Sequence, residues 1–329
     1  MRFAYIAFAS ACAASPLAPA PVEIAMPGPG PLARHDAASR NAACESCHAE
    51  AAATWRSSLH ARAWTDPVFE RSFAKEPAAF CRDCHAPEVA APAIGVACVT
   101  CHDPKSTGEI LAVPRATSAT SERAPHAVRR DSRFAGDGAC ASCHEFPFPD
   151  VAARGGDGAR MQRTIEEHAA SRFADRTCAS CHMPKLASGA RGHAFAVEPM
   201  LARALVVRAT RSDEGVRIDL SPGEIGHAFP TGDLFRRLVI VAEVADDPRA
   251  RAERALARRF RFETNAEGAK IQREIGDDRV AAPKTVEIVL GPEARGREIA
   301  WRVEWQRVVS MRGDVAEIAS AVIVASGRL

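Results

Sequence analysis

The sequence is poor in aromatic side chains and, beyond its N-terminus, in long apolar runs. Aromatic residues make up 6% of its 329 positions, and its one tyrosine is Tyr5. That supply is low for a large conventional core, so we expect some other group to fill part of the interior. No segment after residue 14 is apolar enough to predict a transmembrane helix.

The chain also has no excess of charge of one sign. It carries 43 basic and 41 acidic residues, which give a formal net charge of +2. A bulk charge imbalance is the usual mark of proteins that bind nucleic acid or an anionic membrane surface. We therefore expect no nucleic-acid partner.

Cysteine and histidine, in contrast, follow a strict pattern. Cys12 stands alone, and the other ten of the eleven cysteines form five pairs, each with two residues between its members and a histidine directly after it. The motifs are Cys44-Cys47-His48, Cys81-Cys84-His85, Cys98-Cys101-His102, Cys140-Cys143-His144 and Cys178-Cys181-His182. This pattern is typical of c-type haem attachment.

Each motif is predicted to bind one haem covalently. Two thiols at this spacing can form thioethers with the two vinyl groups of a haem, and the adjacent histidine becomes the proximal ligand of its iron. Zinc sites and disulfides also use paired cysteines, but neither needs a histidine after each pair. Histidine is only 11 of 329 residues, so its place after all five pairs favours five haem c groups.

The N-terminus predicts export. Arg2 precedes an apolar stretch of small residues, so residues 1–14 resemble a signal peptide. A lipobox ending at Cys12 is the alternative, although Ala9 stands where such sequences usually have leucine. Because haem is attached to c-type cytochromes outside the cytoplasm, we expect a periplasmic or extracellular protein, held at a membrane only if Cys12 is lipidated.

Residues 15–34 form a Pro- and Ala-rich leader, and residues 35–200 are predicted to be a pentahaem cytochrome c domain of short helices and loops. The short gap between His85 and Cys98 is expected to hold the second and third haems close together. A repeat is visible: Trp55-x-x-Ser58-x-His60 precedes the second motif, and His168-x-x-Ser171-x-Phe173 precedes the fifth. Each copy is predicted to belong to a helix leading to the next attachment site.

Residues 201–329 have no cysteine and favour an all-β immunoglobulin-like sandwich, which makes the whole chain α+β. Short segments of alternating or continuous apolar residues predict its strands around Val216–Leu220, Leu238–Val241, Val286–Leu290, Ile299–Trp305 and Val322–Val324. Trp301 and Trp305 are predicted to lie in the sandwich core. The stretch from Arg249 to Phe262 resembles an inserted helix.

Histidines outside the motifs are candidates for the distal iron ligands. The strongest candidates are His60, His126, His193 and His227, the last in a tight loop with Gly226, Pro230 and Gly232; His35 and His168 compete for the remaining haem. Met161 and Met200 are weaker alternatives.

Several segments resemble the bacterial multihaem cytochromes related to hydroxylamine oxidoreductase and its tetrahaem electron acceptor. They are Trp55-x-x-Ser58-x-His60-Ala61, Cys140-x-x-Cys143-His144-Glu145-Phe146, Met161-Gln162-x-Thr164-x-x-Glu167, Cys178-x-x-Cys181-His182-Met183-Pro184 and Gly226-His227-x-Phe229-Pro230-Thr231-Gly232-Asp233. The resemblance implies closely stacked bis-histidine haems that conduct electrons, with His60, His126, His193 and His227 as distal ligands. It departs at His168, where that family usually has tryptophan.

The favoured function is electron transfer, as in anaerobic respiration, with other cytochromes or quinol-linked membrane complexes as redox partners. The alternative is a reductase or oxidase of a small nitrogen or sulfur compound, which would need one open haem. Related nitrite reductases carry Cys-x-x-Cys-Lys and hydroxylamine-oxidising relatives use a tyrosine, but every motif here ends in histidine and Tyr5 lies in the predicted signal peptide. A third interpretation, compatible with electron transfer, makes the β-domain a docking module for a redox partner or a cell-surface complex.

Overall fold

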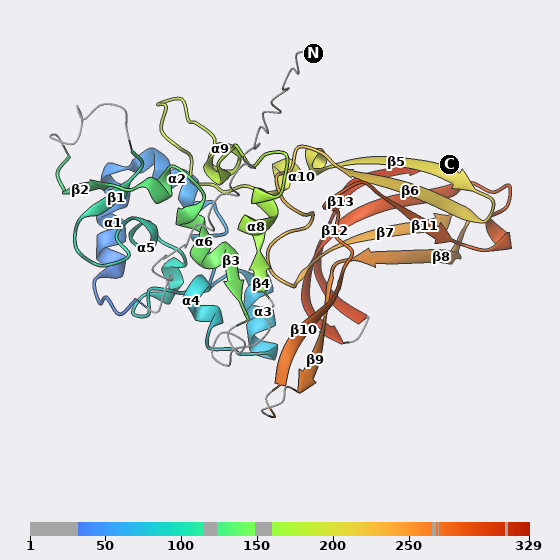
Figure 1. Cartoon of the computed structure of the whole chain (residues 1–329), viewed down its shortest axis with the longest axis horizontal. Helices are drawn as coiled ribbons and strands as arrows, with labels where there is room; N and C mark the ends of the chain where they lie inside the picture. The colour runs from blue at the N-terminus through green and yellow to red at the C-terminus, as the bar shows by residue number, and fades with distance from the viewer. Residues whose placement is uncertain (1–31, 115–123, 149–159, 265–267, 269, 313–314) are drawn as a thin grey trace, which may run out of the picture.

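The computed structural model describes residues 32–114, 124–148, 160–264, 268, 270–312 and 315–329. The predicted signal peptide (1–14), Cys12 and most of the leader (15–34) lie outside these residues. Helices from the first part of the chain gather on one side of the molecule, and strands from the last part gather on the other (Figure 1). The α+β fold class is therefore confirmed. Among the described helices, none combines the length and apolarity that crossing a bilayer requires.

The helices are short, and those that carry the cysteine motifs end at or beside the motif histidine. One helical turn places cysteines three positions apart on the same face, as attachment to a single haem requires. The α-helices are α1 (Ala37–Cys47), α2 (Ala49–Arg56), α3 (Pro67–Lys75), α4 (Cys81–His85), α5 (Cys98–His102), α6 (Gly138–His144), α8 (Thr164–Ala169), α9 (Cys178–His182) and α10 (Glu198–Ala204), and the 3-10 turns are η1 (Pro92–Ile94), η3 (Ser132–Phe134) and η4 (Pro292–Ala294).

The helical part has very little hydrophobic core of its own. One small cluster contains Trp55, Ala97 and Val99. A buried polar cluster adds to it: Nε of Arg34 donates to Glu88 over 2.7 Å, and its Nη1 donates to the carbonyl oxygen of Asp103. This ion pair fastens the start of the described chain to the segments that follow the second and third motifs.

The strands form two larger sheets and several small ones. One larger sheet has the order β11-β6-β5 and the other β13-β12-β7-β8, with every neighbouring pair antiparallel. The strands are β1 (Ile110–Ala112), β2 (Val128–Arg130), β3 (Glu145–Pro147), β4 (Arg160–Arg163), β5 (Leu205–Ser212), β6 (Gly215–Pro222), β7 (Arg236–Val244), β8 (Asp247–Leu256), β9 (Arg258–Thr264), β10 (Lys270–Asp277), β11 (Lys284–Val289), β12 (Ile299–Arg312) and β13 (Val315–Arg328).

The two larger sheets pack face to face as a sandwich. Alternate residues of β6, such as Ile218 and Leu220, are fully buried in one core with Leu238 and Ile240 of β7. That alternation follows from the two-residue period of a strand with one buried face. Strand β11 lies beside β6 in one sheet, and β12 lies beside β7 in the other. Immunoglobulin-like sandwiches distribute their strands between two sheets in the same way.

One sequence-based prediction here is wrong. The stretch from Arg249 to Phe262 is not a helix, because it forms most of β8 and β9. Its many alanines and arginines favour a helix locally. Pairing of β8 with β7 outweighs that preference, and it turns Ala250 and Ala252 toward the core.

The two tryptophans of β12 occupy the predicted position. Trp305 is buried in the sandwich core, and Trp301 packs against the same core. They lie four residues apart on one strand, so both project from the same face. Trp305 also borders the large cavity described below.

Helix α3 connects the helical part to the sandwich. Asp66 is its N-cap and accepts hydrogen bonds from the backbone N–H groups of Val68 and Phe69. The same carboxylate pairs with Arg307 of β12 over 2.6 Å, and both side chains are largely buried. Burial would raise the pKa of Asp66, but the hydrogen bond and charge of Arg307 hold it below its ordinary value of 3.8.

Replacing Asp66 with alanine is expected to lower the free energy of unfolding by about 2–4 kcal/mol, because α3 loses its cap and Arg307 its partner. Asp66→Asn is the matched control. It keeps a capping oxygen but removes the charge, so it should lower the free energy of unfolding by less than Asp66→Ala does. A carboxylate whose pKa is lowered by folding stabilises the folded state at pH values above its ordinary pKa. This contribution is lost as the pH falls through the lowered pKa. In denaturant titrations, the difference between wild type and Asp66→Asn should therefore shrink toward acid pH; a constant difference would contradict this.

Candidate haem-binding cavity

A large cavity lies between the helices and the sandwich. Its volume is 2510 Å³, whereas ordinary ligand pockets have about 300–1,000 Å³. All ten cysteines of the five motifs border it. Ten of the eleven histidines do so as well, namely His48, His60, His85, His102, His126, His144, His168, His182, His193 and His227.

Four motif histidines each face a second histidine that comes from elsewhere in the chain. The ring centroids are separated by nearly the same distance in every case. The pairs are His48 with His126 at 6.4 Å, His60 with His144 at 6.3 Å, His102 with His193 at 6.3 Å and His182 with His227 at 6.4 Å.

This spacing suits two imidazoles on opposite sides of one metal atom. An imidazole nitrogen lies about 2.0 Å from a first-row metal that it binds, and about 1.2 Å from the centre of its own ring. Two such rings across one atom have centroids about 6.4 Å apart. Rings packed directly on each other lie closer, as Phe69 does on His85 at 3.9 Å.

Burial keeps the interior imidazoles in the form that binds metals. It lowers the pKa of His60 to about 3 and that of His227 to about 4, and neighbouring histidines act in the same direction. Burial likewise lowers the pKa of His102, His144 and His182. At neutral pH these rings are neutral, and each therefore has a nitrogen lone pair for a metal.

Backbone carbonyl oxygens determine which ring nitrogen is free. Nδ1 lies 2.7 Å from the carbonyl oxygen of Leu111 in His102, 2.9 Å from that of Arg191 in His193 and 3.0 Å from that of Ala228 in His227. A carbonyl oxygen can only accept, so each Nδ1 carries the proton and donates it. Nε2 is left as the ligand, the arrangement usual for histidines that hold metals.

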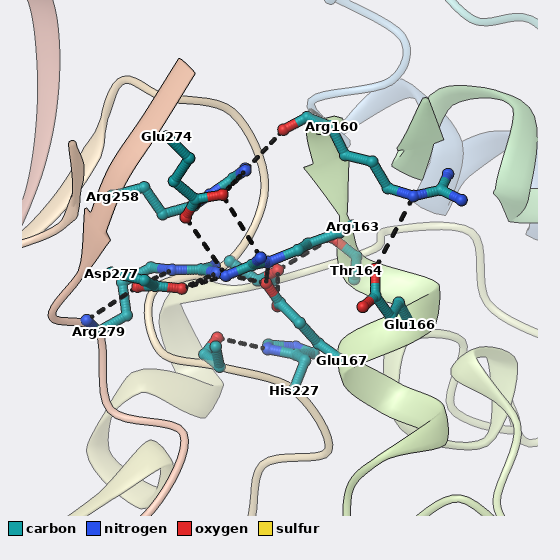
Figure 2. A network of polar contacts seen from close by, with 12 residues as sticks. Arg160, Arg163, Thr164, Glu166, Glu167, His227, Arg258, Glu274, Asp277 and Arg279 are labelled. Atoms are coloured by element: carbon teal, nitrogen blue, oxygen red, sulfur yellow. Dashed lines mark hydrogen bonds and ion pairs between the residues drawn. The ribbon is translucent and has the colours of Figure 1, made fainter. Parts of the chain in front are cut away.

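The loop that carries His227 is tied to α8 by a polar network (Figure 2). Arg279 donates to Glu167 over 2.5 Å and to the carbonyl oxygen of Pro230 over 3.1 Å. Thr231 also donates to Glu167, over 2.6 Å. The loop is thus held at Pro230 and Thr231, close to His227, which borders the cavity.

A second set of contacts in Figure 2 joins β4 to the β9–β10 hairpin. Arg258 donates to the carbonyl oxygens of Arg160 and Met161 over 2.6 and 2.8 Å, and it pairs with Glu274 over 3.0 Å. Its guanidinium is almost completely buried. The hairpin therefore holds the segment that leads into α8, on which the His227 loop depends.

The remaining two candidate ligands lie in other environments. His35 is exposed and is not among the residues that border the cavity. His168 borders the cavity, but its Nδ1 pairs with Asp137 over 2.8 Å, and Asp137 also accepts from the backbone N–H of Cys178. Neither ring faces a motif histidine among the ring contacts of the described residues.

The repeat seen in the sequence has a structural counterpart. Trp55 lies in α2 and His168 in α8. Trp55 donates its indole N–H to the carbonyl oxygen of Val96, just before the third motif, while His168 donates to Asp137, just before the fourth. Both copies thus use a ring N–H to fasten a helix to a neighbouring motif, which accounts for a histidine in place of tryptophan.

Contacts between thiols show how the motifs neighbour one another. Cys84 touches Cys143, and Cys140 touches Cys178. The second and fifth motifs therefore both adjoin the fourth. The third motif adjoins the first, since the backbone N–H of Cys98 donates to the side chain of Asn41 in α1 over 2.9 Å.

The donor set fits the five predicted haems better than zinc. In residues 32–329, excluding the gaps stated above, no group of three or more His, Cys, Asp or Glu side chains is placed to hold a metal ion. A zinc site would need such a group from protein side chains alone. The ring pairs instead leave room between them for a flat group that supplies the other ligands.

Sequence reasoning missed several residues that support the site. Asp137 and Arg279 gave no signal, because their partners lie far away in the chain. Phe69, which stacks on His85, also went unnoticed. Glu167 did fall within a motif of the family resemblance, and its bonds to Arg279 and Thr231 give the physical reason for that motif.

No protein-family model matches this sequence, and no curated protein matches it. Among solved structures, a penta-heme cytochrome c552 from Thermochromatium tepidum is similar to this chain, with a TM-score of 0.61 and 19% sequence identity. The match covers 88% of this chain and 98% of that one. This chain therefore has the fold of that cytochrome over most of its length.

Proposed function

We propose that this chain is an exported pentahaem c-type cytochrome that transfers electrons. The observation that carries the proposal is the set of four histidine pairs, all spaced for one metal atom, around a cavity that every motif cysteine borders. The fold shared with a penta-heme cytochrome supports it.

Under this proposal the five cysteine pairs hold five haem c groups by thioethers, and the histidine that ends each motif is the proximal ligand. His126, His60, His193 and His227 are the distal ligands opposite His48, His144, His102 and His182. When bound, the haems supply one-electron redox chemistry. Two histidines on an iron keep its potential low compared with a histidine–methionine pair.

The thiol contacts suggest the order of the electron path. The first motif adjoins the third, and the second and fifth motifs both adjoin the fourth. His48 and His126 are exposed, so the first haem would lie at the molecular surface. We place the contact with a redox partner, another cytochrome or a quinol-linked complex, at this end. This leaves the sandwich as the support of the fifth haem through His227.

The first test is a haem count. Mass spectrometry of the mature protein should show five covalently added haem masses, because five cysteine pairs border the cavity. The N-terminus found in the same spectrum will show whether residues 1–14 are removed or Cys12 is lipidated. Four or fewer haems in fully matured protein, or zinc in their place, would contradict the proposal.

The second test concerns His227. Replacing it with alanine should convert one haem from low-spin to high-spin or water-ligated in low-temperature EPR, because His182 loses the ring that faces it. All five thioether attachments should survive, since they depend on the cysteines. The low-spin signals of the other paired haems should not change.

His35→Ala is the matched control for this variant. His35 is exposed and lies away from the cavity, so its removal should leave the EPR spectrum and the reduction potentials as in wild type. If His227→Ala also left both unchanged, His227 would not be a ligand. The sandwich would then be independent of the haem chain.

A further inference from the structure

Phe195 touches the distal histidines of two different haems. Its ring lies edge-to-face against His60, with the centroids 4.3 Å apart, and against His193, with the centroids 5.9 Å apart. Under the proposed function, His60 is the distal ligand of the fourth haem and His193 is that of the third. The two distal ligands therefore meet at Phe195, where one side chain can act on both.

His60 differs from the other distal histidines in what orients its ring. A backbone carbonyl oxygen lies within hydrogen-bond distance of Nδ1 in His126, His193 and His227. In the described part of the chain, no hydrogen bond involves a ring nitrogen of His60. The ring of Phe195 is then the contact that limits rotation of the His60 ring about its bond to the iron.

The backbone of Phe195 is in an unfavourable conformation. Its φ is +48°, in the left-handed region that residues with a Cβ atom seldom adopt. Such a conformation persists only where the surrounding structure compensates for it. Here the N–H of Gly192 donates to the carbonyl oxygen of Pro184 over 2.9 Å, and that of His193 donates to Oγ1 of Thr54 over 2.8 Å. A segment that follows the fifth motif is thus fastened to α2, just before His60.

The ring planes of the paired histidines are inclined at very different angles. The angle is 68° between His60 and His144 but only 12° between His182 and His227. The angle between two axial imidazoles determines how they split the d orbitals of a low-spin iron, so it affects both the EPR spectrum and the reduction potential. A contact that fixes the His60 ring therefore fixes a property of the fourth haem.

We infer that Phe195 is a positioning residue for the third and fourth haems, and that its ring keeps His60 steeply inclined to His144. The inference rests on the proposed function, because it presupposes that these histidines bind iron. The second and fifth motifs both adjoin the fourth. The potential that Phe195 helps to set therefore belongs to the haem at which these branches of the electron path meet.

The main variant is Phe195→Leu, studied in fully matured protein by low-temperature EPR and by redox titration. In wild type, the steep angle of the fourth haem should give a low-spin signal at high g. In the variant this signal should move to lower g, because His60 can turn toward the plane of His144. The signal of the third haem should shift less, because His193 keeps its bond to the carbonyl oxygen of Arg191. The potentials of the same two haems should shift, while the fifth haem keeps its spectrum.

Phe134→Leu is the matched control. Phe134 lies 5.0 Å from His102, the proximal ligand of the third haem, so its removal should shift the signal of that haem alone. A signal that moves in Phe195→Leu and not in Phe134→Leu is therefore that of the fourth haem.

Two further variants separate the ring of Phe195 from its backbone. Phe195→Tyr keeps an aromatic ring and should retain the wild-type spectrum. Phe195→Gly removes the ring but suits a left-handed backbone. It should show the same shift as Phe195→Leu, and it replaces that variant as the test if the leucine variant does not fold.

Three results would overturn the inference. The first is an EPR spectrum and potentials that stay unchanged in Phe195→Leu and Phe195→Gly with all five haems attached. The second is a shift confined to the signal that Phe134→Leu also moves, since Phe195 would then not act on His60. The third is a shift in Phe195→Tyr as large as that in Phe195→Leu. Fewer than five haems in the wild-type protein would instead contradict the proposed function.

Discussion

Imidazole rings that face one another across a shared cavity are the feature on which the rest of this structure depends. They come in pairs with a nearly constant separation of 6.3 to 6.4 Å. An isolated polar ring in an apolar interior costs free energy unless it is bonded. In His102, His193 and His227 one nitrogen donates to a carbonyl oxygen, which leaves the other nitrogen free to bind a metal. The low aromatic content and the small cluster around Trp55 follow, because the group that fills the cavity takes the place of a side-chain core.

The sandwich and the helical part therefore have different sources of stability. The sandwich buries a continuous core of aliphatic side chains and Trp305. The helical part depends on buried polar contacts, such as that of Arg34 with Glu88, and on attachments to the sandwich. Two attachments stand out: Asp66 with Arg307, and Glu167 with Arg279. The first fixes α3, which carries Phe69, and the second fixes the loop of His227. The sandwich thus acts on the cavity in two places, which makes it more than an appendage.

His85 and His168 show how similar residues acquire different roles. Both donate through Nδ1, His85 to a carbonyl oxygen and His168 to the carboxylate of Asp137. His85 follows a cysteine pair and borders the cavity, whereas His168 takes the place that Trp55 has in the first copy of the repeat. The number of histidines alone suggested enough ligands for every haem. Their placement instead separates four complete pairs from one supported but unpaired ring.

The sequence by itself predicted the local features of this protein. A cysteine pair followed by histidine specifies its own chemistry within one helical turn, and a two-residue apolar period identifies a strand such as β6 or β12 because it reflects the geometry of adjacent residues. The preferred distal candidates, His60, His126, His193 and His227, are the four that face motif histidines. What the tertiary structure alone decided involves residues far apart in the chain: which histidine faces which motif, that His85 faces none, and that Arg249–Phe262 forms strands. Those outcomes depend on packing between distant segments, and such packing overrides local preference because burial and pairing contribute more free energy than intrinsic propensity does.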